Sequence, residues 1–151
     1  MEQTREEIMD MNTDSTRMAL LEALAKLQAH TTVNEDGTIH VWHQGKSLVI
    51  TVSNVFVRIW DLYWKTITPN DPEPHLSDAV NAANSGPFAT LVMAKSEDGE
   101  LTYVHTKIDF MFPPGIPYPE EYIMAFLQEI DRVRVRLDSH LQALNSNQQP
   151  Q

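Results

Sequence analysis

Residues 55–67 read Val-Phe-Val-Arg-Ile-Trp-Asp-Leu-Tyr-Trp-Lys-Thr-Ile, the longest strand-like run of the chain. It is rich in β-branched and aromatic residues, which favours a β-strand. On strict alternation, one face of this strand carries Phe56, Arg58, Trp60, Leu62 and Trp64. The opposite face carries Val55, Val57, Ile59, Asp61 and Tyr63. Because both faces are largely apolar, the sequence predicts a central strand that is partly covered on each side.

Shorter elements flank this run on both sides. Strand-like stretches at Thr38–His43 and Ser47–Ser53 precede it, and the glycine-containing segment between them predicts a hairpin. A short amphipathic helix at Leu76–Ala83 follows it. The stretches Phe88–Lys95 and Leu101–Phe112 then predict a second hairpin.

Longer helices are predicted at both ends. Leucines at helical spacing indicate a helix from Asp14 or Ser15 to about Ala29. Pro119 opens a second helix, whose apolar stripe continues to about Leu144. The element order is α-β-β-β-α-β-β-α. It predicts an α+β fold with a five-stranded antiparallel sheet and the terminal helices packed on that sheet.

The predicted domain covers residues 14–144. Residues 1–13 form a lead-in that is either flexible or a short helix, because Thr4 and Glu7 have the spacing of a capping box. Residues 145–151 are polar and lack apolar anchors, so we expect a disordered tail.

The composition restricts the function. The 151 residues include 11 Lys and Arg, 21 Asp and Glu, and no cysteine, which gives a formal net charge of -10. This charge repels a phosphate backbone, so we expect no nucleic-acid partner. The lack of cysteine excludes disulfides and thiolate chemistry. Neither a basic, apolar leader nor a membrane-length apolar run is present, which predicts a cytoplasmic protein without a membrane partner.

Three segments carry a resemblance to a known family. They are the aromatic run Val57–Trp64, the short-helix pattern Ala79–Asn84, and the proline-rich segment Pro113–Pro119 ahead of a long helix. Together they resemble the YbjN-like family, bacterial proteins proposed to act as sensory transduction regulators. The element order is also similar to the fold of type III secretion chaperones. The resemblance implies a small acidic protein that forms a homodimer and binds a protein or peptide partner.

The aromatic residues Trp60, Tyr63 and Trp64 are the first candidate binding residues. They fit two interpretations, either packing beneath a helix or forming a partly exposed patch for a peptide or a second subunit. Tryptophan and tyrosine are enriched at interfaces because they combine a large apolar body with a polar group. Alternation alone places Trp60 and Trp64 on one face.

Two polar residues complete the candidate binding set. Arg58 can pair with a carboxylate, stack on a tryptophan or hold an anionic ligand. Asn81 can bond to a neighbouring loop or contact a ligand, whereas Asn84 fits a helix cap or a left-handed position. Asp61 and Asp109 lie within predicted strands, where aspartate is disfavoured, so we expect each to lie on the solvent face or to pair with Arg58, Lys65 or Lys107.

No catalytic motif is present. The six histidines lack HxH or HExxH spacing, and no glycine-rich phosphate loop or nucleophile motif occurs. We therefore expect no catalytic residue, no metal site and no cofactor. The leading hypothesis is a non-catalytic protein-binding module, either chaperone-like or regulatory. The alternative is a small-molecule sensor that uses Arg58 or Asn81, and an enzyme with a site of scattered Asp, His and Arg is a third option.

Overall fold

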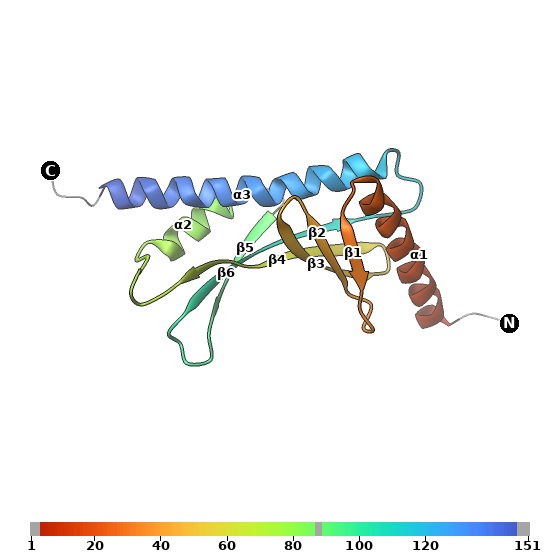
Figure 1. The fold of residues 1–151 in the computed structure, drawn as a ribbon, viewed down its shortest axis with the longest axis horizontal. Helices are drawn as coiled ribbons and strands as arrows, with labels where there is room; N and C mark the ends of the chain where they lie inside the picture. The colour runs from red at the N-terminus through yellow and green to blue at the C-terminus, as the bar shows by residue number, and fades with distance from the viewer. Residues whose placement is uncertain (1–3, 87–88, 148–151) are drawn as a thin grey trace. The chain divides into compact units, whose positions relative to one another are not determined.

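A computed structural model describes residues 4–86 and 89–147 of the chain (Figure 1). Its helices and strands follow one another as α1 (Arg5–Lys26), β1 (His30–Val33), β2 (Ile39–His43), β3 (Lys46–Ser53), β4 (Phe56–Ile67), α2 (Leu76–Ala83), β5 (Ala89–Lys95), β6 (Thr102–Met111) and α3 (Pro119–Asn147). The predicted α+β class with an antiparallel sheet is confirmed. Phe88, the first residue of the predicted fourth strand, lies outside the described residues.

The number of strands in the sheet differs from the prediction. The sheet has six strands, in the order β1-β2-β3-β4-β6-β5, where five were expected. The additional strand is β1, which pairs antiparallel with β2 from His30↔Trp42 to Val33↔Ile39. With only four residues and no buried side chain, β1 lacks the apolar alternation that identifies a strand from sequence.

The chain divides into two compact units. The first unit comprises residues 1–60 and 109–125, and the second comprises residues 61–108 and 126–151. In the first unit, α1 packs on β1 and β3. Its buried residues Leu20, Ala23 and Leu24 face a sheet side that includes Ile39 and Ile50. This side forms the core, and burial of each leucine or isoleucine contributes roughly 1.5–3 kcal/mol.

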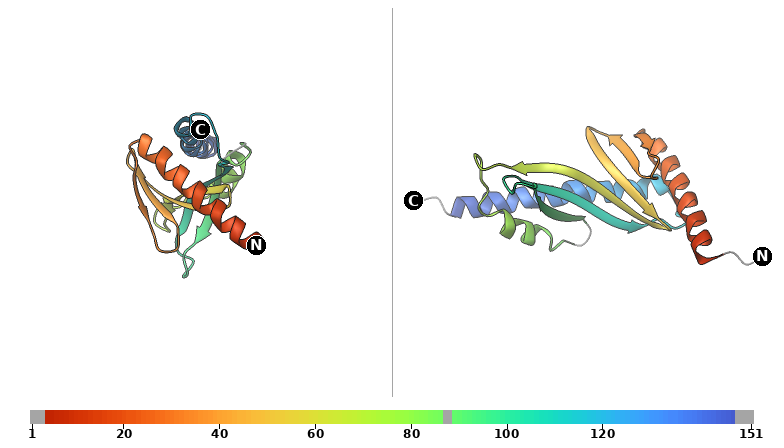
Figure 2. Two further views of the ribbon diagram at one scale, coloured as in Figure 1. Left: turned by 90° about the vertical axis from the view of Figure 1, so that its right-hand side faces the viewer. Right: turned by 90° about the horizontal axis from the view of Figure 1, so that it is seen from below.

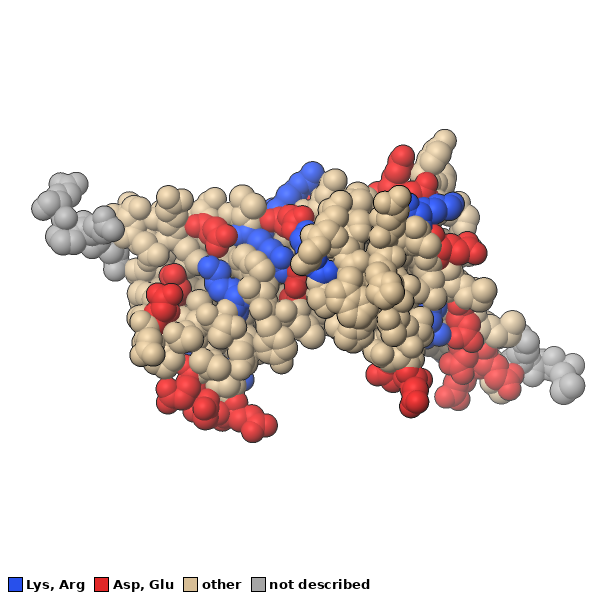
Figure 3. All heavy atoms as spheres, viewed as in Figure 1, with Lys and Arg blue, Asp and Glu red and all other residues tan. Residues whose placement is uncertain are grey.

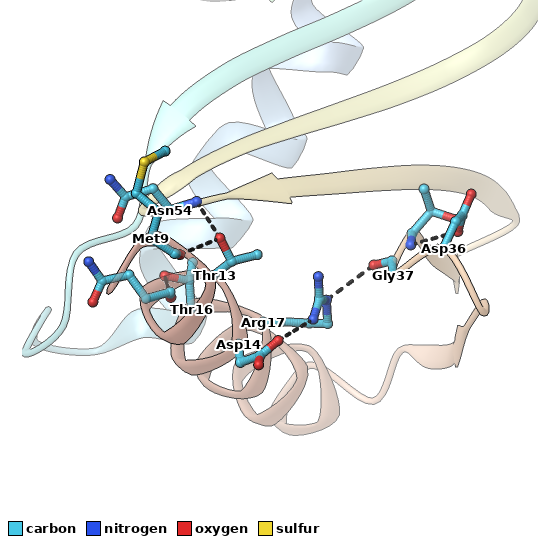
Figure 4. A network of polar contacts seen from close by, with 10 residues as sticks. Met9, Thr13, Asp14, Thr16, Arg17, Asp36, Gly37 and Asn54 are labelled. Carbon is cyan, nitrogen blue, oxygen red and sulfur yellow. Dashed lines mark hydrogen bonds and ion pairs between the residues drawn. The ribbon is translucent and has the colours of Figure 1, made fainter. Parts of the chain in front are cut away.

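Polar contacts also hold α1 in place (Figure 4). Thr13 Oγ1 donates to the Met9 carbonyl at 2.9 Å and accepts the Asn54 N–H at 2.7 Å. Asn54 has a φ of 57°, which suits the tight turn between β3 and β4. On the next turn, Arg17 Nε donates to the Gly37 carbonyl at 3.1 Å. The helix is therefore tied to two loops of its own unit.

The start of α1 is another correction. The helix begins at Arg5, inside the predicted lead-in, and not at Asp14 or Ser15. Thr4 and Glu7 form the capping box that their spacing indicated, with bonds of 3.1 and 3.2 Å. At its other end the helix stops at Lys26 rather than near Ala29.

In the second unit, α2 and most of α3 pack together and against strands. Arg136 of α3 donates through Nε to the Ala83 carbonyl at the end of α2, at 3.4 Å. Figure 1 shows α2 beneath this part of α3. The stripe Ile130, Val133 and Leu137 is buried, as the sequence predicted. The helix extends to Asn147, so residues 145–147 of the predicted tail are helical, while 148–151 lie outside the described residues.

Among the residues described, no helix is long and apolar enough to cross a membrane.

Candidate functional site

The first unit leaves one side of its sheet without a helix. Cross-strand pairing places Thr51 opposite Arg58 and Ser53 opposite Phe56. All four side chains are exposed, while Val57, between Phe56 and Arg58, and Ile50, next to Thr51, are buried. Since successive side chains of a strand point to opposite faces, these four belong to a sheet face that α1 does not cover. We refer to this surface as the open face.

A hollow of about 580 Å³ lies on the open face, where β3, β4 and the end of β6 come together. Its lining residues are Thr51, Ser53, Phe56, Val57, Arg58, Asp109, Phe110 and Met111. Phe56 and Met111 keep 55% and 50% of their surface exposed. Two large apolar side chains therefore border a concave surface that is open to solvent.

An ion pair lies in the same hollow. Arg58 Nε and Nη2 donate to the two carboxylate oxygens of Asp109 at 2.6 and 3.2 Å. These bonds, with the charge of Asp109, raise the pKa of Arg58, which keeps it cationic. Of the arrangements expected for Asp109, a solvent-facing position or a pair with Arg58 or a lysine, the structure shows the pair with Arg58. Both side chains remain about half exposed, at 47% and 49%, so this pair is accessible to a partner.

The open face continues toward β2. Trp60 pairs across the sheet with Val49, which in turn pairs with His40. Trp60 is two residues from Arg58 on the same strand and is partly exposed. Further along, Trp42 is exposed, with its ring 5.5 Å from that of His30. Aromatic side chains therefore extend the apolar character of the face beyond the hollow.

Tyr63 lies in the second unit and interrupts the regular strand. Its φ is 54°, a left-handed conformation that is uncommon for a bulky residue and typical of a bulge. Its backbone N–H donates to His105 Nδ1 at 2.8 Å. The Tyr63 ring packs edge-on against Tyr103 and His105, with ring centres 4.9 and 4.7 Å apart. Burial lowers the pKa of His105, which keeps its Nδ1 available as the acceptor.

The irregularity at Tyr63 breaks the strict alternation from which the face of Trp64 was predicted. Strict alternation placed Asp61 and Trp64 on opposite faces, yet both contact the guanidinium of Arg134. Asp61 forms an ion pair with the Arg134 guanidinium. The central carbon of this guanidinium, Cζ, lies 4.8 Å from the centre of the Trp64 ring. Trp64 therefore packs against α3, in agreement with the interpretation of a tryptophan beneath a helix.

The role of Arg134 was missed. Its side chain and that of Asp61 retain only 12% and 11% of their surface. The sequence shows Arg134 among alternating charges of a helix, which predicts a solvated face. No local signal connects it to a strand far away in the sequence.

Asn81 is exposed on α2, and its neighbour Asn84 makes the structural contacts. Asn84 Nδ2 donates to the Leu91 carbonyl at 2.9 Å, and Asn84 Oδ1 accepts the Leu91 N–H at 2.7 Å. Asn84 is the C-cap residue, as predicted, but its φ of -73° is not left-handed. These bonds attach α2 to β5 within the second unit.

The candidate binding residues thus fall into separate groups. Arg58 and Trp60 share the open face of the first unit. Tyr63 belongs to an aromatic cluster, Trp64 to the packing under α3 and Asn81 to the surface of α2, all in the second unit. Met111 of the hollow was not singled out from sequence, because its place beside Phe56 depends on the fold. Within 4–86 and 89–147, no three His, Asp or Glu residues gather in a way that could hold a metal ion.

Comparison with known proteins gives a likeness in fold. No family model matches the chain, and no curated protein matches it in sequence. Among solved structures, the chain is similar to YbjN from E. coli, a protein proposed to be a transcription regulator. The TM-score is 0.56 at 13% identity, over 87% of this chain and 92% of that one. The chain therefore has a fold like that of YbjN, in line with the resemblance seen in its sequence.

Proposed function

We propose that the chain is a non-catalytic protein-binding module whose open face receives a segment of a partner protein. The observation that carries this proposal is the hollow, in which Phe56 and Met111 flank the half-exposed Arg58–Asp109 pair. Apolar anchors around a polar contact are the usual composition of an interface centre. A bidentate arginine pair adds directional hydrogen bonding to the apolar contact.

The shape of the hollow favours a polypeptide over a small ligand. Small-molecule sites bury most of the ligand surface, which requires enclosing walls. Here the bordering side chains are about half exposed, and the face continues past Trp60 toward Trp42. An extended or helical segment can cover such a surface.

The biological role that we propose is regulatory or chaperone-like. The likeness in fold to a protein proposed to be a transcription regulator supports the proposal that this chain acts by binding another molecule. A second copy of the chain is one partner that we propose for the open face. Light scattering at micromolar concentration distinguishes a dimer from a monomer.

Peptide selection tests the proposal. We would select peptides from a random phage-displayed library on the full chain and measure their affinity by fluorescence anisotropy. Phe56→Ser and Met111→Ser should each weaken binding by about tenfold, as expected for apolar anchors. Val135→Ser is the matched control, because Val135 is 65% exposed on α3. Selected peptides that bind all three variants equally well would contradict the proposal.

A small-molecule sensor is the second candidate. The volume of the hollow is within the roughly 300–1,000 Å³ of small-molecule sites, and Arg58 supplies a cation for an anionic ligand. A metabolite panel in a thermal-shift assay tests it. A carboxylate that raises the melting temperature of the wild type but not of Arg58→Met would favour this candidate.

A further inference from the structure

The outer side of α1 carries a regular line of side chains that the open face does not involve. Glu7, Met11, Asp14, Met18 and Glu22 follow one another at intervals of four, three, four and four residues. This spacing places them along one face of a helix. The buried residues Thr16, Leu20, Ala23 and Leu24 lie on the other side. We call the outer line the α1 ridge.

The side chains of the ridge are exposed to solvent. Met11 and Met18 keep 56% and 66% of their surface exposed, and the three acidic residues are also exposed. The helix has no buried residue before Thr16. Figure 2 shows the N-terminal turns of α1 continuing beyond the strands of its unit. Exposed apolar residues in register along a helix are typical of an interaction surface.

The chemistry of the ridge identifies the kind of partner. Methionine is flexible and polarizable, so it adapts to different apolar side chains. The carboxylates on both sides of each methionine favour cationic groups. Figure 3 shows acidic side chains gathered near the N-terminal end of the chain. We propose that the α1 ridge binds a basic amphipathic helix of a partner protein, whose apolar residues contact Met11 and Met18 and whose lysines or arginines pair with the carboxylates.

Local contacts of the carboxylates do not prevent such pairing. Asp14 pairs with Arg17 at 2.9 Å, and the Asp14 side chain is 74% exposed. Glu7 accepts the Thr4 N–H at 3.2 Å in the capping box. A carboxylate has about four acceptor positions, so each retains capacity for a second cation. No interaction of Glu22 with another described residue competes for its carboxylate.

Charge disfavours a second copy of the chain as the occupant. In an antiparallel pair of α1 helices, contact of Met11 with Met18 of the other copy places Glu7 opposite Glu22. In a parallel pair, each acidic residue faces its own equivalent. Like charges directly opposite one another are destabilising, so both arrangements oppose self-association. A basic partner replaces this repulsion with attraction.

A designed peptide tests the ridge on the full chain. The probe is a labelled helix of about 18 residues with leucine at i, i+3, i+4 and i+7 and lysine elsewhere. A scrambled peptide of the same composition controls for attraction to the net charge. Met11→Ser/Met18→Ser removes the apolar contacts, and Val135→Ser is the matched apolar control. Glu22→Gln removes one ridge charge, and Glu35→Gln, in an exposed turn, is its matched control.

We expect the amphipathic peptide to bind more tightly than the scrambled peptide. The double methionine variant should lose about tenfold in affinity, and Glu22→Gln a few-fold, with neither control variant changed. Far-UV circular dichroism confirms that the helix content is retained. Equal binding of both peptides, no binding of either, or unchanged affinity in the methionine variant would overturn the proposal. A dimer that the methionine substitutions dissociate would instead identify a second copy as the occupant and would also overturn it.

Discussion

Removal of the Asp61 charge should destabilise the protein far more than removal of the Asp109 charge. Each aspartate pairs with an arginine, but the environments differ. Asp61 and Arg134 retain only 11% and 12% of their side-chain surface, whereas Asp109 and Arg58 retain about half. Breaking a buried pair leaves an uncompensated charge in the interior, at a cost of about 3–5 kcal/mol. A pair at half exposure contributes about 1 kcal/mol or less.

Urea unfolding followed by circular dichroism measures both effects. Asp61→Asn keeps the shape of the side chain and removes only its charge, so we expect it to lower the free energy of unfolding by about 3 kcal/mol. Asp109→Asn is the matched control, with an expected loss of about 1 kcal/mol or less. Combining Asp61→Asn with Arg134→Met removes the unpaired cation and should recover part of the loss. Equal losses for Asp61→Asn and Asp109→Asn would show that burial of the Asp61–Arg134 pair does not control its contribution to stability.

Two further predictions concern the second unit. Asn84→Ala leaves the Leu91 N–H and carbonyl without their side-chain partner and should cost about 2 kcal/mol in urea unfolding, whereas the exposed Asn81→Ala should cost less than about 0.5 kcal/mol. Burial lowers the pKa of His105 from its ordinary value of 6.5, so the folded state binds fewer protons there than the unfolded state. This contribution to stability is present above pH 6.5 and is lost as the pH falls through the lower, folded pKa. Wild type should therefore lose more stability between pH 7 and 5 than His105→Gln, and equal losses would show that another group controls this range.

Much of the fold follows from local patterns. The helix at Leu76–Ala83 was predicted to the residue, because its apolar spacing and the adjacent Asn84 cap agree. The capping box at Thr4 and Glu7 was also visible, yet α1 was expected to start later. The polar first turns of α1 have no buried face, so their apolar periodicity is weak. Strand β1 escaped prediction for a similar reason, since an exposed edge strand needs no alternation.

The candidate site was only partly predictable. Arg58 and Trp60 were identified because strand alternation places their side chains on the same face of one long strand. This alternation is interrupted after Leu62, where the left-handed Tyr63 shifts Trp64 to the side of Asp61 and Arg134. A left-handed residue that is a tyrosine carries no glycine or proline signal in the sequence. Met111 and Arg134 contact residues that are far away in the sequence. The periodicity of a single sequence gives no information on such contacts.

The most direct test of the open face uses the absence of cysteine from the chain. Ser53→Cys places a unique thiol in the lining of the hollow, and Ser139→Cys places one on the exposed surface of α3 as a control. Each is labelled with a dye that responds to the polarity of its surroundings, and a peptide selected on the wild-type chain is added. We predict a blue shift at position 53 that saturates with peptide, and no shift at position 139. A peptide that binds with unchanged emission at position 53 would contradict the claim that the open face is the binding surface.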